Sequence, residues 1–195
     1  MRRENSQRRR PGSREPADRI LVVCGGDVTE PSYFEGLRQF HRNPAIKVVI
    51  RKKSVDPVNL VAYAAKLRDN DPDSFEDVWC VVDVDDFDLE PAITLAARKN
   101  ISLAVSNPCF ETWLLLHFTN QTAPLTCYME AARVLRGFVP DYCKSRLDFG
   151  RYADGLDAAV ERARKLAEPG REHLANPASG VWALIRKFEG GHEPL

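Results

Sequence analysis

The chain has 195 residues, of which 44% are hydrophobic and 29% charged, and its formal net charge at pH 7 is zero. These values are typical of one ordinary globular domain with its own core, and they exclude a strong overall field toward nucleic acid or membranes. No apolar stretch is long enough for a membrane span or a signal-peptide core, so no membrane association is expected.

The first residues of the chain, 1–19, differ sharply from the rest. They contain almost nothing apolar and carry seven arginines: Arg2, Arg3, Arg8, Arg9, Arg10, Arg14 and Arg19. This composition predicts a disordered basic tail. A solvated tail is the favoured interpretation, and a phosphate-binding arm is the alternative.

Strand-like and helix-like segments then alternate. Apolar runs predict buried strands at 20–24, 46–50, 78–83 and 101–106, and helical spacing predicts helices at 31–41, 57–67 and 91–99. This alternation predicts an α/β fold with an open, mainly parallel sheet flanked by helices.

The remainder of the chain reads as a helical C-terminal extension. Asn107, followed by Pro108, is expected to cap a strongly apolar helix at 109–118. Further helices are predicted at 126–136, 152–168 and 181–188.

The five cysteines (Cys24, Cys80, Cys109, Cys127 and Cys143) are odd in number and show no metal-binding spacing. Cys24 and Cys80 fall within apolar runs, where reduced cysteine behaves as a small hydrophobe. We expect a cytoplasmic protein with neither disulfides nor a zinc site.

Three carboxylates, Asp83, Asp85 and Asp86, follow the third predicted strand directly. Side chains alternate along a strand, so Asp83 and Asp85 are expected to project to the same side, at the sheet edge where α/β proteins bind ligands. Crowded carboxylates repel one another unless a cation or a shared proton relieves them, and Mg²⁺ prefers oxygen ligands. The cluster indicates either a metal site or a solvated acidic turn.

Three ordered segments together resemble the RloB-like family of bacterial proteins. They are GGDVTEPSYF at 25–34, which is similar to the family pattern EGxxTEPxYF, DVDD at 83–86, and SNPCFETWLLLHF at 106–118. Weaker similarity continues through 142–144 and 176–181.

The resemblance implies a Toprim-like core at about 20–118 and a helical extension at about 119–195, together forming one domain, 20–195. It implies a nuclease that acts in phage defence, depends on Mg²⁺ (with Mn²⁺ as a possible substitute) and cleaves DNA or RNA. It also implies an AAA- or ABC-type ATPase as a partner protein, since this chain has no Walker A motif of its own. A homo-oligomer is compatible with it.

The resemblance also assigns roles to residues. Asp83 and Asp85 match the metal-binding pair, and Asp86 is expected to support them. The family glutamate that assists proton transfer reads Gly25 here, so Asp27 or Glu30 is expected to replace it. Because of Gly25, the alternative is a non-catalytic interaction subunit of a defence complex.

Glu30 and Glu111 each have a structural alternative. Both fall in the first turn of a predicted helix, where a carboxylate is favoured by the helix dipole. We expect catalytic roles for both beside this capping role.

Four further residues are expected to contact substrate. Gly26 allows a phosphate to approach the backbone, although a tight turn is the commoner reason for such a glycine. Asn107 is a cap or a substrate ligand, His117 a core histidine or a ligand, and Lys144 a solvated or phosphate-binding side chain.

Overall fold

The computed structural model describes residues 19–41, 46–50, 55–72, 74–84 and 87–189, with the backbone alone described for 46–50. The predicted basic tail therefore lies outside the described residues, except for Arg19, and so do Asp85 and Asp86.

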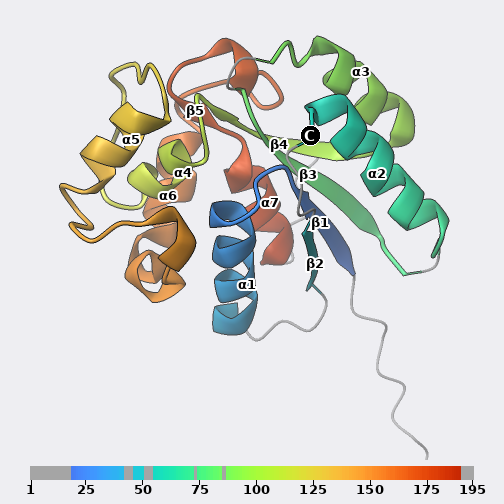
Figure 1. Ribbon diagram of the computed structural model, residues 1–195, viewed down its shortest axis with the longest axis horizontal. Coiled ribbons are helices and arrows are strands. Elements are labelled where there is room, and N and C mark those ends of the chain that lie inside the picture. Colours follow the sequence, from blue (N-terminus) through green and yellow to red (C-terminus); the bar gives the residue numbers. More distant parts are fainter. Residues whose placement is uncertain (1–18, 42–45, 51–54, 73, 85–86, 190–195) are drawn as a thin grey trace, which may run out of the picture.

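A mainly parallel sheet forms the centre of the structure (Figure 1). Its strands are β1 (Ile20–Cys24), β2 (Ile46–Ile50), β3 (Asp77–Asp83), β4 (Ser102–Asn107) and β5 (Ala178–Ser179), in the order β2-β1-β3-β4-β5. The first four strands are parallel, and β5 pairs antiparallel with β4. This confirms the predicted α/β fold. The extension, predicted to be helical throughout, also contributes β5 to the sheet.

Seven α-helices accompany the sheet in the described part of the chain. They are α1 (Thr29–His41), α2 (Pro57–Asp69), α3 (Glu90–Lys99), α4 (Glu111–Leu116), α5 (Tyr128–Leu135), α6 (Leu156–Ala163) and α7 (Val181–Phe188). Short 3₁₀ turns lie at η1 (Lys144–Arg146), η2 (Phe149–Arg151), η3 (Ala153–Gly155) and η4 (Glu172–Leu174). The prediction for α7 is confirmed residue for residue.

Two helix boundaries were predicted wrongly. Asn107 is the last residue of β4, where it pairs with Ala178, so it does not cap a helix, and α4 begins only at Glu111. The helix predicted at 152–168 is confined to α6, because 3₁₀ turns precede it. In the second of these turns Gly155 packs so closely on the His117 carbonyl that a Cβ there would lie 2.3 Å from its oxygen.

The sheet separates two apolar cores. Alternation along β1 sends Ile20, Val22 and Cys24 into the core under α1 and α4–α7, and Leu21 and Val23 into the core under α2 and α3. The extension helices therefore pack on the same face as α1 rather than forming a separate body. None of the described helices is long and apolar enough to cross a membrane.

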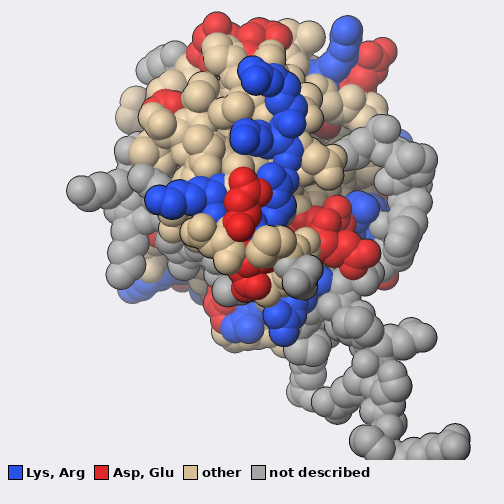
Figure 2. Space-filling model, turned by 90° about the vertical axis from the view of Figure 1, so that its right-hand side faces the viewer, with Lys and Arg blue, Asp and Glu red and all other residues tan. Residues whose placement is uncertain are grey.

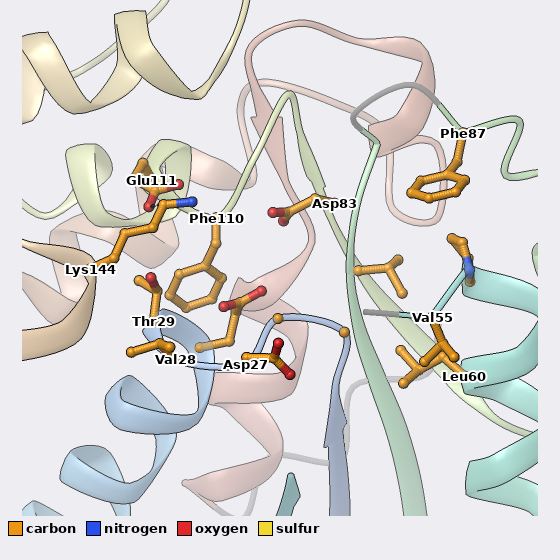
Figure 3. Close-up of a pocket in the computed structure, with 15 residues that line it drawn as sticks. Asp27, Val28, Thr29, Val55, Leu60, Asp83, Phe87, Phe110, Glu111 and Lys144 are labelled. Carbon is orange, nitrogen blue, oxygen red and sulfur yellow. Dashed lines mark ion pairs between the residues drawn. The ribbon is translucent and has the colours of Figure 1, made fainter. Parts of the chain in front are cut away.

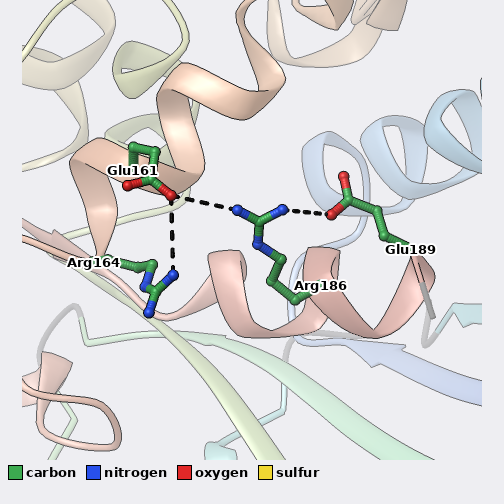
Figure 4. Close-up of polar contacts among 4 residues, drawn as sticks. All are labelled: Glu161, Arg164, Arg186 and Glu189. Atoms are coloured by element: carbon green, nitrogen blue, oxygen red, sulfur yellow. Dashed lines mark hydrogen bonds and ion pairs between the residues drawn. The ribbon is translucent and has the colours of Figure 1, made fainter. Parts of the chain in front are cut away.

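Ion pairs join α6 to α7 at the surface (Figure 4). Arg186 lies 3.4 Å from Glu161 and 2.8 Å from Glu189, and Arg164 lies 4.0 Å from Glu161. Because these side chains are partly exposed, the pairs orient the helices more than they stabilise them.

His117 lies in the larger core. Its Nδ1–H donates to the Tyr152 carbonyl oxygen (2.7 Å), which leaves Nε2 to accept from the Tyr33 hydroxyl at 3.2 Å. Burial lowers the pKa of His117 to about 4, because the charged ring would lose its hydration. The ring is therefore neutral and structural.

The histidine pKa predicts an acid sensitivity of the fold. The unfolded chain binds a proton at His117 below about pH 6.5, whereas the native state resists it down to about 4, so stability falls as pH falls between these values. Urea unfolding at pH 7 and pH 5 should show about 2 kcal/mol of loss that is absent in His117→Asn. His41→Asn, at the exposed end of α1, is the control and should retain that loss.

Candidate functional site

A pocket of about 310 Å³ lies at the carboxyl ends of β1 and β3 (Figure 3). It is bounded by the turn after β1, the start of α1, the end of β3, the starts of α2 and α4, and Lys144 of η1. Ligands of open α/β sheets bind at this edge.

The pocket has two walls of opposite character. One is polar and is formed by Asp27, Glu30, Asp83, Glu111 and Lys144; we call it the acidic wall. The other, the apolar wall, is formed by Val55, Pro57, Leu60, Val82 and Phe87. Figure 3 shows Asp83 and Glu111 on one side of β3 and Phe87, Val55 and Leu60 on the other.

Strand alternation creates this division. In β3, Trp79 and Val81 face the core under α1, and Cys80 and Val82 face the core under α2. Asp83 follows the first set and projects toward Phe110 of the α4 side (Figure 3).

Glu30 is almost fully buried at the start of α1. Burial raises the pKa of its carboxyl, and the charge of Glu111 raises it further; hydrogen bonds from the backbone amides of Glu30 and Gly26, and the charge of Lys144, act in the opposite direction. A Cβ on Gly26 would lie 2.2 Å from both carboxylate oxygens. Gly26 is therefore needed to make room for this carboxylate.

Glu111 is held from the extension. It is 1% exposed, and Oε1 accepts a hydrogen bond from the Tyr142 hydroxyl (2.7 Å) and lies 3.8 Å from Lys144 Nζ. The ammonium of Lys144 also lies 3.5 Å from the centre of the Tyr128 ring. Burial, and then the charge of Glu111, raise the pKa of Tyr142, so the tyrosine remains a hydrogen-bond donor.

Gly25, where the family pattern has glutamate, continues the sheet. Its N–H donates to the Val81 carbonyl (2.9 Å), and a Cβ there would lie 3.2 Å from that oxygen and 3.5 Å from Leu60 Cδ2. The Cα–Cβ bond of a side chain at this position would therefore point toward Leu60 of the apolar wall. Glu30, five residues further along the chain, places a buried carboxylate on the acidic wall.

The other residues predicted for the site are divided. Gly26, Asp27 and Lys144 line the pocket together with Glu30, Asp83 and Glu111. Asn107 does not line it; its Nδ2 donates to the His173 carbonyl (3.1 Å) and so ties β4 to η4. His117 lies in the core, as described above.

Sequence reasoning missed the whole apolar wall, Tyr128 and the role of Tyr142. The weak family similarity at 142–144 was the one signal for Tyr142. Phe87 and Val55 gave none, because isolated apolar residues in loops have no periodicity.

The acidic side chains that line the pocket offer carboxylate oxygens, and oxygen atoms are the ligands that a hard cation such as Mg²⁺ prefers. Among the residues described, which exclude Asp85 and Asp86, no group of three or more His, Cys, Asp or Glu side chains is placed to hold a metal ion. Of the three expected metal ligands, Asp83 is thus the one that the structure describes, and it lines the pocket.

Comparison with known proteins gives one match. The family model described as RloB-like protein matches residues 20–188, which is most of the chain. No curated protein and no solved structure matches.

The raised pKa of Glu30 predicts that a neutral side chain at this position stabilises the protein at high pH. A buried carboxyl with a raised pKa stabilises the native state at low pH and loses that contribution as the pH rises through the pKa of the folded state. Glu30→Gln, which cannot ionise, should therefore unfold at higher urea than the wild type at pH 8, and the gain should vanish near pH 4.

Glu35→Gln on the same helix is the matched control of opposite sign. Hydrogen bonding to Arg38 lowers the pKa of Glu35, so this substitution should reduce stability at pH 8. A Glu30→Gln protein that is less stable than the wild type at pH 8 would contradict the buried placement.

Proposed function

The chain belongs to the RloB-like protein family, and we propose that it is a Mg²⁺-dependent, Toprim-like nuclease that cleaves phosphodiester bonds of DNA or RNA in bacterial anti-phage defence. The observation that carries the proposal is the acidic wall. In the part of the chain that the structure describes, four carboxylates from three separate segments share one pocket with Lys144, at the sheet edge where α/β enzymes bind substrate.

The charge of this wall favours a cation-dependent reaction. Carboxylates that line one pocket raise its negative potential and would repel a phosphodiester, unless bound cations or protons compensate. Asp83, with Asp85 and Asp86 beyond the described residues, would hold Mg²⁺. When bound there, the metal would supply charge neutralisation for phosphate oxygens and would make a bound water more acidic.

Glu30 is suited to proton transfer. A general acid or base works best with a pKa near the working pH, and burial shifts Glu30 in that direction. It occupies the acidic wall in place of the carboxylate that Gly25 lacks. We assign it the role of general acid/base, and Asp27, which is exposed in the same turn, is the second choice.

Lys144 and Glu111 complete the proposed mechanism. Lys144 is half exposed and carries the one positive charge among the described residues that line the pocket, so its ammonium can contact a substrate phosphate oxygen. Glu111 and Tyr128 hold that ammonium in place from two sides. Tyr142 in turn fixes Glu111.

Basic side chains outside the pocket support a nucleic-acid partner. Figure 2 shows Lys and Arg gathered in a band on one face of the molecule. The last turns of α2 and α3 carry four basic residues, Lys66, Arg68, Arg98 and Lys99, and Arg68 donates to the Lys99 carbonyl (2.5 Å). We propose that this band contacts phosphates of the strand outside the pocket. ATP-driven control would come from a separate ATPase partner.

A cleavage assay tests the proposal. Purified protein is incubated with plasmid, single-stranded DNA and tRNA, with Mg²⁺, with Mn²⁺ or with EDTA. We expect metal-dependent cleavage that is lost in Asp83→Ala/Asp85→Ala and reduced about a hundredfold or more in Glu30→Gln, since general acid–base catalysis contributes about 10²- to 10⁴-fold.

Glycine variants provide the matched control for Glu30. Gly26→Ala should displace the Glu30 carboxylate and reduce cleavage, whereas Gly25→Ala, whose Cβ meets Val81 and Leu60 instead, should retain it. Thermal unfolding of each variant separates loss of fold from loss of chemistry. Equal cleavage by the wild type and the double aspartate variant would rule out this active site.

Gly25 favours a second candidate, a non-catalytic interaction subunit that works with the ATPase. Under this alternative the wild type is inactive, and Gly25→Glu restores metal-dependent cleavage. Our proposal predicts the reverse: an active wild type that gains little from Gly25→Glu, because Glu30 already supplies the carboxylate. The same assay on the two proteins decides between them.

A further inference from the structure

We propose that the apolar wall binds one unpaired nucleobase of the strand to be cleaved, stacked on Phe87. The inference rests on the proposed nuclease function and names its substrate more closely, as a single strand or an extruded nucleotide. It is carried by the juxtaposition, in one pocket, of an acidic wall and an aromatic-lined apolar wall.

The apolar wall is formed before any ligand arrives. Val82 and Leu60 belong to the core under α2 and α3, and Pro57 opens α2, whose start is fixed by an Asp56 side chain that accepts from the Asn59 N–H at 3.0 Å. These residues make this part of the apolar wall rigid. A ligand there pays little for ordering the protein.

Phe87 is the exposed part of this wall. It is 47% exposed although it is a large apolar residue, and its N–H donates to the Val84 carbonyl at 3.0 Å, which fixes its backbone beside the end of β3. Figure 3 shows its ring on the side of β3 opposite Asp83. An exposed aromatic ring at the mouth of an apolar pocket is suited to stacking.

A nucleotide matches both walls at once. Its phosphodiester carries the charge that the acidic wall would bind through a cation and Lys144, and its base has an apolar face for Phe87. The bases of an intact duplex are already stacked on their neighbours and cannot reach such a wall without being extruded. The pocket, of about 310 Å³, therefore selects one unpaired nucleotide at a time.

A double-mutant cycle tests this stacking directly. Fluorescence anisotropy measures binding of a labelled 12-nucleotide single strand, with Ca²⁺ replacing Mg²⁺ to suppress cleavage. Phe87→Ala should weaken binding about fivefold to a hundredfold, the range for losing one stacked base. Phe87→Trp, which keeps an aromatic ring at this position, should bind as tightly as the wild type. Phe40→Ala, an exposed phenylalanine at the far end of α1, should have no effect.

The second arm of the cycle removes the base instead of the ring. The wild type should bind a strand with abasic sites more weakly than the intact strand, by the same factor as the Phe87→Ala substitution. On the abasic strand, Phe87→Ala and the wild type should have equal affinity. A duplex of the same sequence should be insensitive to Phe87→Ala. Equal affinity of wild type and Phe87→Ala for the intact strand would overturn the proposal.

Three further outcomes are informative. A mononucleotide that competes as tightly as the strand would overturn the assignment to a polymer and point to a free nucleotide. If metal-dependent cleavage is absent but the Phe87 and abasic effects coincide, base binding stands and the nuclease proposal fails. If cleavage occurs with equal rates in wild type and Phe87→Ala, and binding is also equal, the base site fails alone.

Discussion

The electrostatic cost of burying two carboxylates, Glu30 and Glu111, on one wall of a pocket is the constraint on which this site depends. Glu30 and Glu111 are both nearly inaccessible to water, and burial together with the charge of Glu111 raises the pKa of Glu30. The fold supplies the compensation locally. Glu30 receives backbone amides of the α1 turn, and Glu111 receives a phenol and an ammonium from the extension.

This arrangement gives the two adjacent glycines different roles. Gly25 continues the β1–β3 hydrogen bonding and faces Leu60, whereas Gly26 leaves the space that the Glu30 carboxylate fills. The first turn of α1 thus places the Glu30 carboxylate on the acidic wall.

The sequence predicted the parts of the fold that depend on periodicity. Periodicity is sufficient to predict β1, β3 and β4 from their apolar runs and α7 from its helical stripe. The order of the strands then places Asp83 and Glu30 at the same edge of the sheet. It did not predict β5, because two residues carry no pattern, nor the late start of α4, because Asn107 is used by β4. The apolar wall brings Phe87 together with Val55 and the first residues of α2, which lie apart from it in the sequence and share no local pattern with it.

The hydrogen bond from Tyr142 to Glu111 shows how the two parts of the chain depend on each other. Division of the chain into a catalytic core and an appended extension would assign all the acids to the former. Yet a fragment ending after α4 would retain Glu111 without its phenol donor and without the Lys144 ammonium that pairs with it. The smallest fragment able to hold this site is therefore much larger than the sheet beside it. A domain boundary placed after α4 on the basis of topology would separate Glu111 from Tyr142 and Lys144.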